Sequence, residues 1–250
     1  MQLEDGTRAE AEVGGPSGPT DTDAQILGIA ALAEPVRRSL YRFVVSRPAP
    51  VSREEAAAGV EVAHHVAKFH LDKLVADGLL EVEYSRPPGR GGPGAGRPAK
   101  RYRRASGEVS VSLPERHYEL AGRLLARAVS EASSGDLPVG EALSRVARDE
   151  GRVLGERIHM RTGTRPSRSD LVAATIETLS ECGYEPRADE GGVTMVNCPF
   201  HALAQEYTDL VCGMNLELIQ GLLESLGRPV LDARLDPGPG RCCVRLGAMQ

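Results

Sequence analysis

The sequence predicts a mainly helical α+β protein with small sheets, in which a basic N-terminal part is followed by an acidic C-terminal part. Apolar residues recur at helical spacing through most of the 250 residues, and short alternating runs separate the helical stretches. Residues 36–104 carry 14 basic and 7 acidic side chains, whereas the remainder carries 16 basic and 28 acidic ones. A basic region within an acidic chain indicates one surface that binds a polyanion.

The composition excludes several classes of protein. The chain is 41% hydrophobic and 26% charged, which is ordinary for a soluble globular protein. No apolar run is long enough to span a bilayer, and the acidic N-terminus lacks a signal-peptide pattern, so we expect a cytoplasmic protein with no membrane partner. In that compartment the five cysteines favour a metal site, a redox role or core packing over structural disulfides.

The N-terminal part is predicted to begin with a disordered tail over residues 1–20, which are rich in Gly, Pro, Thr and acidic residues. Helical periodicity and cap residues then predict helices over 23–33, 35–47, 52–58 and 63–76. Ser52 and Glu55 have the spacing of a capping box, which places the start of the short third helix.

A winged arrangement is predicted after these helices. An alternating run over 79–84 indicates a strand, residues 87–99 are all Gly, Pro, Arg and Ala, and residues 100–104 are expected to form the returning strand. The predicted order is helices, a turn, a further helix, a strand, a basic loop and a strand. This is the order of a winged helix-turn-helix. We therefore assign residues 21–105 to a winged helix-turn-helix DNA-binding domain.

The C-terminal part is predicted to contain two regions. Apolar faces predict helices over about 112–160, which we assign to a helical linker and dimerisation region, residues 106–165; packing within one chain is the other interpretation of these faces. Residues 166–250 are assigned to an α+β sensor domain that bears cysteines. Its predicted elements are a helix from Ser169 or Asp170 to Cys182, a strand over 192–196, a long helix over 201–226, and strands over 230–235 and 242–246.

The helix over 63–76 is the one that a helix-turn-helix places in the major groove. Its outward positions are candidate DNA contacts, namely His64, His65, Lys68, Phe69 and Lys73. Arg53 on the preceding helix is a candidate phosphate contact. The predicted wing adds basic candidates, which can enter the negative potential of a minor groove: Arg90, Arg97, Lys100 and Arg101. A charged helix face can be merely solvated, and paired histidines can bind a metal, but the conjunction of elements favours DNA.

Residues 66–80 resemble the recognition helix of ArsR-like winged-helix bacterial repressors, and residues 96–102 resemble their wing. The resemblance implies a bacterial homodimer that binds double-stranded DNA at an inverted-repeat operator. One departure is informative. Metal-sensing members of that superfamily often carry a Cys-x-Cys pair in the recognition-helix region, and this region has no cysteine here. A sensor, if present, therefore lies elsewhere in the chain.

Several cysteines in the C-terminal part are candidate metal ligands. Cys198, Cys212 and the pair Cys242 and Cys243 lie on three predicted elements and can meet only through tertiary folding. Soft thiolates favour iron–sulfur clusters or zinc. If Cys242 and Cys243 open a strand, their side chains point to opposite faces, and only one is expected to serve a given site. The alternative, favoured for Cys182, is that a cysteine is a small apolar core residue.

Residues 197–204 and 210–215 resemble the SufR group, which are iron–sulfur-dependent repressors, and the similarity covers roughly residues 24–250. The resemblance implies a [4Fe–4S] cluster held by three cysteines. By carry-over these ligands are Cys198, Cys212 and either Cys242 or Cys243. The vicinal pair and the wider last spacing depart from the simplest pattern. His201 is the nearest candidate for a fourth ligand, and with it a Cys₃His zinc site is equally plausible on ligand chemistry.

These observations predict a DNA-binding transcriptional regulator whose operator affinity is controlled by an iron–sulfur cluster held by C-terminal cysteines. The alternative is a zinc-stabilised winged-helix regulator that responds to another ligand or to thiol oxidation. We expect no enzyme activity, because the sequence contains no Gly-rich phosphate loop, nucleophile elbow or Cys–His–Asp arrangement with a chemical rationale.

Overall fold

The structure is a computed structural model that describes residues 21–85, 98–135 and 137–248. The chain divides into two compact units, Met1–Val111 and Ser112–Gln250, and each has its own hydrophobic core. The disordered tail predicted over residues 1–20 lies outside the described residues, as does most of the predicted wing loop. In the described part of the chain, no helix is long and apolar enough to cross a membrane.

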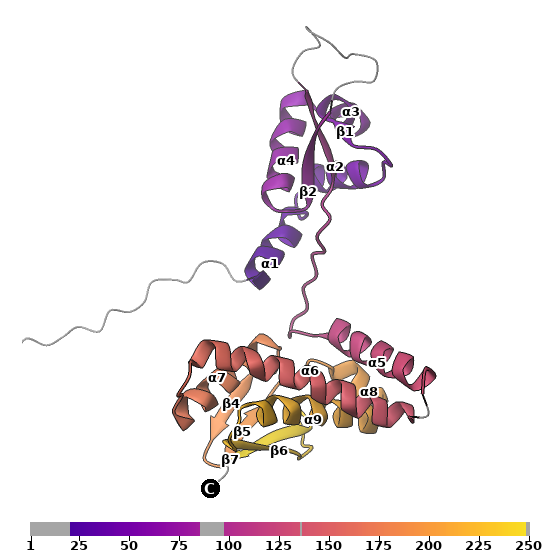
Figure 1. Cartoon of the computed structure of the whole chain (residues 1–250). Helices are drawn as coiled ribbons and strands as arrows, with labels where there is room; N and C mark the ends of the chain where they lie inside the picture. Colours follow the sequence, from indigo (N-terminus) through magenta and orange to yellow (C-terminus); the bar gives the residue numbers. More distant parts are fainter. Residues whose placement is uncertain (1–20, 86–97, 136, 249–250) are drawn as a thin grey trace, which may run out of the picture. The chain divides into compact units, whose positions relative to one another are not determined.

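The first unit has the predicted order of elements with one additional short strand (Figure 1). Its elements are α1 (Asp21–Ala31), α2 (Pro35–Val45), β1 (Val51–Ser52), α3 (Arg53–Gly59), α4 (His64–Ala76), β2 (Leu80–Ser85) and β3 (Ala99–Arg104). The strands pair antiparallel in the order β1-β3-β2. β1 was not predicted, because a strand of two residues is too short to show alternation.

Local capping fixes the starts of two of these helices. The Glu34 carboxylate accepts hydrogen bonds from the first backbone N–H groups of α2. The predicted capping box of α3 is confirmed: Ser52 Oγ accepts from Glu55 N at 3.1 Å, and Glu55 Oε2 accepts from Ser52 N at 2.7 Å. Gly78, at φ +73°, ends α4 in a left-handed conformation that favours glycine.

The core of the first unit fixes α4 against the sheet. The side chains of Leu40, Leu71, Leu74, Leu80 and Tyr102 are at most 2% exposed and come from α2, α4 and both long strands. This packing buries one face of α4 and leaves the opposite face exposed to solvent.

The second unit contains the remaining helices and a separate antiparallel sheet of strand order β4-β5-β7-β6. Its elements are α5 (Tyr118–Ser133), α6 (Val139–Thr162), α7 (Arg168–Glu181), β4 (Pro186–Asp189), β5 (Gly192–Met195), α8 (His201–Glu206), α9 (Thr208–Ser225), β6 (Leu231–Leu235) and β7 (Val244–Ala248). α9 packs on the sheet, α6 packs along α9, and α5 and α7 pack on α6 (Figure 1). The domain boundary predicted between residues 165 and 166 therefore falls inside one continuous core.

α6 and α9 approach each other at the level of the backbone. A Cβ atom on Gly151 would lie 1.9 Å from the carbonyl oxygen of Leu218, and one on Gly221 would lie 2.0 Å from that of Arg148. Only glycine allows so close an approach. The helix pair thus forms a rigid support for the elements packed on either side of it.

Several details of the predicted second unit differ from the structure. The single helix predicted over 201–226 is broken into α8 and α9 at Tyr207, whose backbone (φ −126°, ψ 55°) is not helical. Near this break the side chains of Tyr207 and Leu210 are exposed, although they lie within the apolar pattern that predicted one helix. The strand predicted to open at Cys242 instead begins at Val244, and β4, whose residues are largely exposed, was missed.

Candidate functional site

α4 presents a face suited to reading DNA. Ala67, Leu71 and Leu74 are fully buried beneath it. The predicted contacts on the outer face are all exposed: His64, His65, Lys68, Phe69 and Lys73. The Phe69 side chain is 67% exposed. In a major groove an aromatic side chain at such a position can contact a thymine methyl group.

Two of these side chains already have acidic partners within the first unit. His64 Nε2 lies 2.9 Å from Glu54 Oε1, and Lys73 Nζ donates to Asp77 Oδ1 at 2.7 Å. Contact of His64 or Lys73 with DNA would compete with these pairs. Lys68, one turn from His64 on the exposed face, is the basic candidate at the centre of the helix surface.

Asp72 of α4 holds the base of the wing. Its Oδ1 accepts hydrogen bonds from the Tyr102 hydroxyl at 3.0 Å and from Lys100 Nζ, both on β3. Burial raises the pKa of Asp72, but the hydrogen bonds from Lys100 and Tyr102 outweigh it, so the pKa of the carboxyl is lowered overall. The Arg53 guanidinium interacts with the Tyr102 hydroxyl as well. This network ties the recognition helix to the strand that leaves the wing.

The predicted wing residues fall into two groups. Arg101 Nη1 donates to the Pro50 carbonyl at 2.9 Å, so Arg101, like Lys100, fastens β3 to the rest of the unit. Direct DNA contact by these two side chains stays a prediction. Arg90 and Arg97 lie outside the described residues.

In the second unit four of the cysteines meet at one end of the two central strands of the sheet, β5 and β7. β5 and β7 are antiparallel neighbours, so the residues after β5 and those before β7 lie together. Cys198 follows β5, while Cys242 and Cys243 precede β7, with Cys242 N donating to the Met195 carbonyl at 2.8 Å. α9 brings Cys212 to the same place. Cys198, Cys212, Cys242 and Cys243 are called the cysteine site below.

The thiols of the cysteine site lie close to one another. Cys242 interacts with both Cys198 and Cys243, and Cys212 interacts with Cys243. The expected start of the strand at Cys242 is wrong: both cysteines precede β7, so strand alternation does not decide which way their side chains point. Both vicinal thiols therefore face other cysteines.

Their surroundings raise the pKa of the Cys198, Cys212 and Cys242 thiols, which favours the protonated form. Contact with Cys242, together with burial, raises the pKa of Cys198 well above its usual range. Contact with Cys198 lowers the pKa of Cys242, but contact with Cys243 and burial raise it, to about 11 overall. Burial likewise raises the pKa of Cys212. Binding of a soft metal here would release protons.

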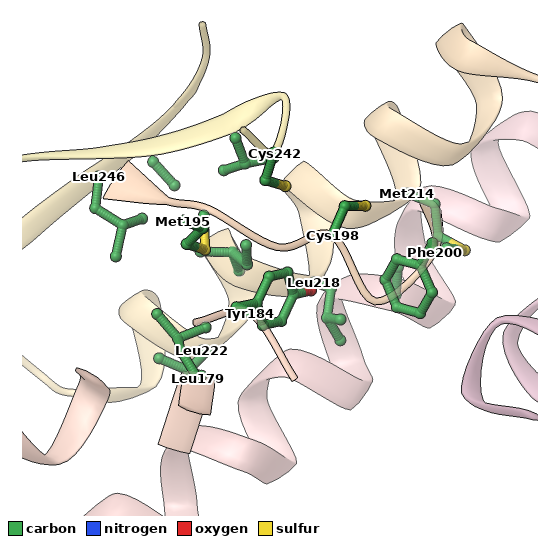
Figure 2. Close-up of a cluster of buried hydrophobic side chains, with 14 of the residues drawn as sticks. Leu179, Tyr184, Met195, Cys198, Phe200, Met214, Leu218, Leu222, Cys242 and Leu246 are labelled. Carbon is green, nitrogen blue, oxygen red and sulfur yellow. The ribbon is translucent and has the colours of Figure 1, made fainter. Parts of the chain in front are cut away.

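A buried polar chain supports one side of the site. The Tyr184 hydroxyl donates to Asn215 Oδ1, and Asn215 Nδ2 donates to Cys242 Sγ at 3.3 Å. Tyr184 and Asn215 are each 1% exposed. Figure 2 shows Cys198 and Cys242 beside the Tyr184 ring within the apolar core. Neither Asn215 nor Tyr184 was predicted to belong to the site. For Asn215 the available signal was a polar residue on the apolar face of a helix.

The other candidate ligands lie differently. His201 is the first residue of α8, and its side chain is exposed. Cys182 is the C-cap of α7, where burial raises its pKa to about 11. Within the described ranges, no three side chains of His, Cys, Asp or Glu already meet in a geometry that holds a metal ion. The donor set of the cysteine site fits a cluster or zinc by its chemistry, and metal binding would require the thiols to rearrange.

Residues 32–83 match a family model described as a helix-turn-helix domain. The matched stretch runs from the end of α1 through α2, α3 and α4 into β2, so it contains the exposed face of α4. The first unit is a helix-turn-helix domain, which indicates a DNA-binding transcription regulator, and such domains are typically non-enzymatic. Searches of curated proteins and of solved structures find no match to the chain.

Proposed function

We propose that the protein is a homodimeric transcriptional regulator whose operator affinity is controlled by an iron–sulfur cluster, of the [4Fe–4S] type, bound at the cysteine site. The observation that carries the proposal is the convergence of four thiols, from the loop after β5, from α9 and from the turn before β7, in a chain with a helix-turn-helix domain. Cysteine sulfur is the donor that iron–sulfur clusters use.

The residues of the site have distinct roles in this proposal. Cys198, Cys212 and one or both of the vicinal thiols hold the cluster, and Asn215 orients Cys242 through its side-chain amide. When bound, a cluster supplies a link between these elements that is lost when iron is withdrawn or the cluster is oxidised. The surrounding core excludes water from the thiols.

On the DNA side, a dimer would place two copies of α4 about one helical turn apart on an inverted repeat. Exposed apolar side chains on α5 and α6 support self-association. They are Val129, Val139, Val153 and Met160, between 45% and 79% exposed. A coupling of about 1.4 to 2.8 kcal/mol between cluster and DNA would change operator affinity by about 10- to 100-fold.

A second candidate is a zinc-stabilised regulator that responds to another ligand or to thiol oxidation. The pairwise contacts of Cys198 with Cys242 and of Cys212 with Cys243 favour it, because four thiols suffice for a closed tetrahedral zinc site. His201, whose side chain is exposed, is not needed in such a site.

The deciding experiment is purification of the full chain without oxygen, followed by visible absorbance and by iron, sulfide and zinc analysis. About four iron and four sulfide per chain would support the cluster proposal. Operator binding is then compared between the loaded protein and a chelator-treated sample. One zinc per chain and no visible absorbance would contradict the cluster and support the second candidate. Absence of any metal would contradict both metal-binding candidates.

A further inference from the structure

The second unit begins with a segment that is hydrogen-bonded to the loop carrying Cys198. Residues 112–117, called the junction segment here, directly follow the DNA-binding unit in the chain. Arg116 Nη1 donates to the Cys198 carbonyl at 3.1 Å, and His117 N donates to the Pro199 carbonyl at 3.1 Å. The junction segment is therefore attached to two successive peptide groups, Cys198–Pro199 and Pro199–Phe200.

Asn197 completes the attachment from the opposite direction. Its Nδ2 donates to the Glu115 carbonyl at 3.0 Å and to the Gly183 carbonyl at 2.6 Å, and its Oδ1 accepts from Arg116 Nη1. Asn197 is only 6% exposed, so both polar atoms of this buried amide are satisfied by these partners. One side chain thus joins the junction segment, the turn after α7 and the Cys198 loop.

Arg116 is itself held at a fixed place in the junction segment. Its backbone N–H donates to Ser112 Oγ at 2.8 Å, so residues 112–116 form a closed turn. A charge-assisted hydrogen bond to a carbonyl inside a partly buried site is stronger than a neutral one. Displacement of the Cys198 peptide would therefore either break this bond or move the turn with it.

We propose that Arg116 and Asn197 form a latch that transmits the state of Cys198 to the junction segment and so to the DNA-binding unit. The latch rests on the proposed function, because it requires a ligand or modification that moves the Cys198 loop. Arg116 and Asn197 are positioning residues: Arg116 contacts the Cys198 carbonyl, Asn197 holds Arg116 and the Glu115 carbonyl, and neither is a ligand.

The direct test is amide hydrogen exchange of the metal-free, reduced full chain. Arg116→Ala should increase exchange at residues 112–118 while α6 and α9 stay protected. Arg116→Lys, which retains a cation, should restore part of the protection. The matched control is Arg123→Ala, because Arg123 is an exposed residue of α5 paired only with Glu119 one turn away.

A cycle with Cys198→Ser separates transmission from a merely structural role. In the wild-type background this change should alter exchange at residues 112–118, and in the Arg116→Ala background it should alter it much less. Equal effects in both backgrounds, or unchanged exchange in Arg116→Ala, would overturn the latch. This measurement needs no bound metal, so it decides the latch even where the cluster proposal fails.

The functional arm compares operator affinity of cluster-loaded and metal-free protein. With the latch intact we expect a difference of at least about 10-fold, and Arg116→Ala should reduce it to less than about 3-fold without lowering the iron content or the metal-free affinity. A loaded wild-type protein with no difference would contradict the proposed function. An undiminished difference in Arg116→Ala would contradict the latch alone.

Discussion

The side-chain amide of Asn215 donates a hydrogen bond of 3.3 Å to the sulfur of Cys242. The Oδ1 atom of the same amide accepts a hydrogen bond from the Tyr184 hydroxyl. Tyr184 in the core, Asn215 on α9 and the candidate ligand Cys242 therefore form one hydrogen-bonded chain. A buried polar group keeps its partners at a fixed orientation because leaving any of them unpaired costs free energy.

Replacing one member of this chain should therefore be more damaging than replacing both. Asn215→Leu leaves the Tyr184 hydroxyl buried and unpaired, and we expect a loss of about 1–3 kcal/mol in the free energy of unfolding. The double variant with Tyr184→Phe removes both polar groups and should recover part of that loss. Urea unfolding followed by circular dichroism measures the wild type, the two single variants and the double variant. The single variant Tyr184→Phe has its own loss in the free energy of unfolding. If the double variant is less stable than Asn215→Leu by that same amount, the two groups are independent.

The limits of prediction from the sequence follow from the range of the interactions involved. Periodicity and capping are local, so the helices of the first unit and the capping box at Ser52 could be predicted. The contact of Asn215 with Cys242, 27 residues apart in the sequence, depends on how α9 packs on the sheet, which no local pattern encodes. The break at Tyr207 lies within a continuous apolar period, and for that reason one helix was expected where the structure has two.

The cysteine site, too, could be predicted from the sequence only in part. Soft-ligand chemistry could be predicted from residue type, and the convergence of Cys198 with Cys242 follows from strand pairing that the sequence does not specify. Because β7 begins two residues later than predicted, at Val244, the strand alternation expected for Cys242 and Cys243 does not apply to them. The network around Asp72 could not be predicted, since its partners Lys100 and Tyr102 are on β3, about 30 residues further along the chain.

The contact between α6 and α9 should tolerate no side chain at Gly151. An added Cβ would lie 1.9 Å from the Leu218 carbonyl oxygen, so Gly151→Ala must separate the helices and should cost about 1–3 kcal/mol or more. Gly122→Ala on α5 is the matched control, because nothing lies within 4 Å of its added Cβ. Helix propensity alone should make that variant equal to or up to about 1 kcal/mol more stable than wild type. Thermal unfolding of the two variants gives the comparison, and a tolerated Gly151→Ala would refute the close approach.

Lys68 should contribute more to operator binding than Lys73. Lys68 lies on the exposed face of α4, whereas the Lys73 ammonium is 2.7 Å from Asp77 Oδ1 and must leave that pair to reach DNA. We expect Lys68→Ala to cost about 1–3 kcal/mol if it contacts a base, and Lys73→Ala to cost less. Fluorescence anisotropy with labelled operator at several salt concentrations measures both, with Arg123→Ala as the charge-matched control. The assignment of the reading surface fails if Lys68→Ala binds as tightly as the control.

The Asp72 network should make the first unit sensitive to acid. A carboxyl whose pKa is lowered in the folded state stabilises the fold above its unfolded pKa of about 3.9, and that contribution is lost as the pH falls through the folded value. The partner Lys100 has a raised pKa, because its hydrogen bonds with Asp72 and Tyr102 outweigh its burial, so its contribution is lost only in strong alkali. Because the ion pair is partly exposed, the effect should be about 1 kcal/mol or less.

Asp72→Asn is expected to lower stability near neutral pH and to flatten the decline below about pH 4. Hydrogen exchange at residues 64–76 and 99–104, measured across the acid range, reports on the network directly. Asp149→Asn on α6 is the control, since its carboxylate pairs with Arg152 on an exposed surface of the second unit. An acid profile of Asp72→Asn that coincides with that of the wild type would rule out the network as the source of the sensitivity.

The cysteine variants should divide by position. Cys198→Ala and Cys212→Ala remove thiols from two different elements of the site, and either should abolish binding of the cluster or of zinc. Cys182→Ala changes only the C-cap of α7 and should retain the wild-type metal content. Metal analysis of each variant, purified without oxygen, provides the measurement, and chelation of wild-type protein supplies the metal-free reference. Full metal occupancy in Cys212→Ala would show that α9 supplies no ligand to the site.

Comparison of Cys242→Ala with Cys243→Ala identifies the ligand from the turn before β7. We expect Cys242→Ala to have the larger effect on metal content, because Asn215 already orients the Cys242 sulfur.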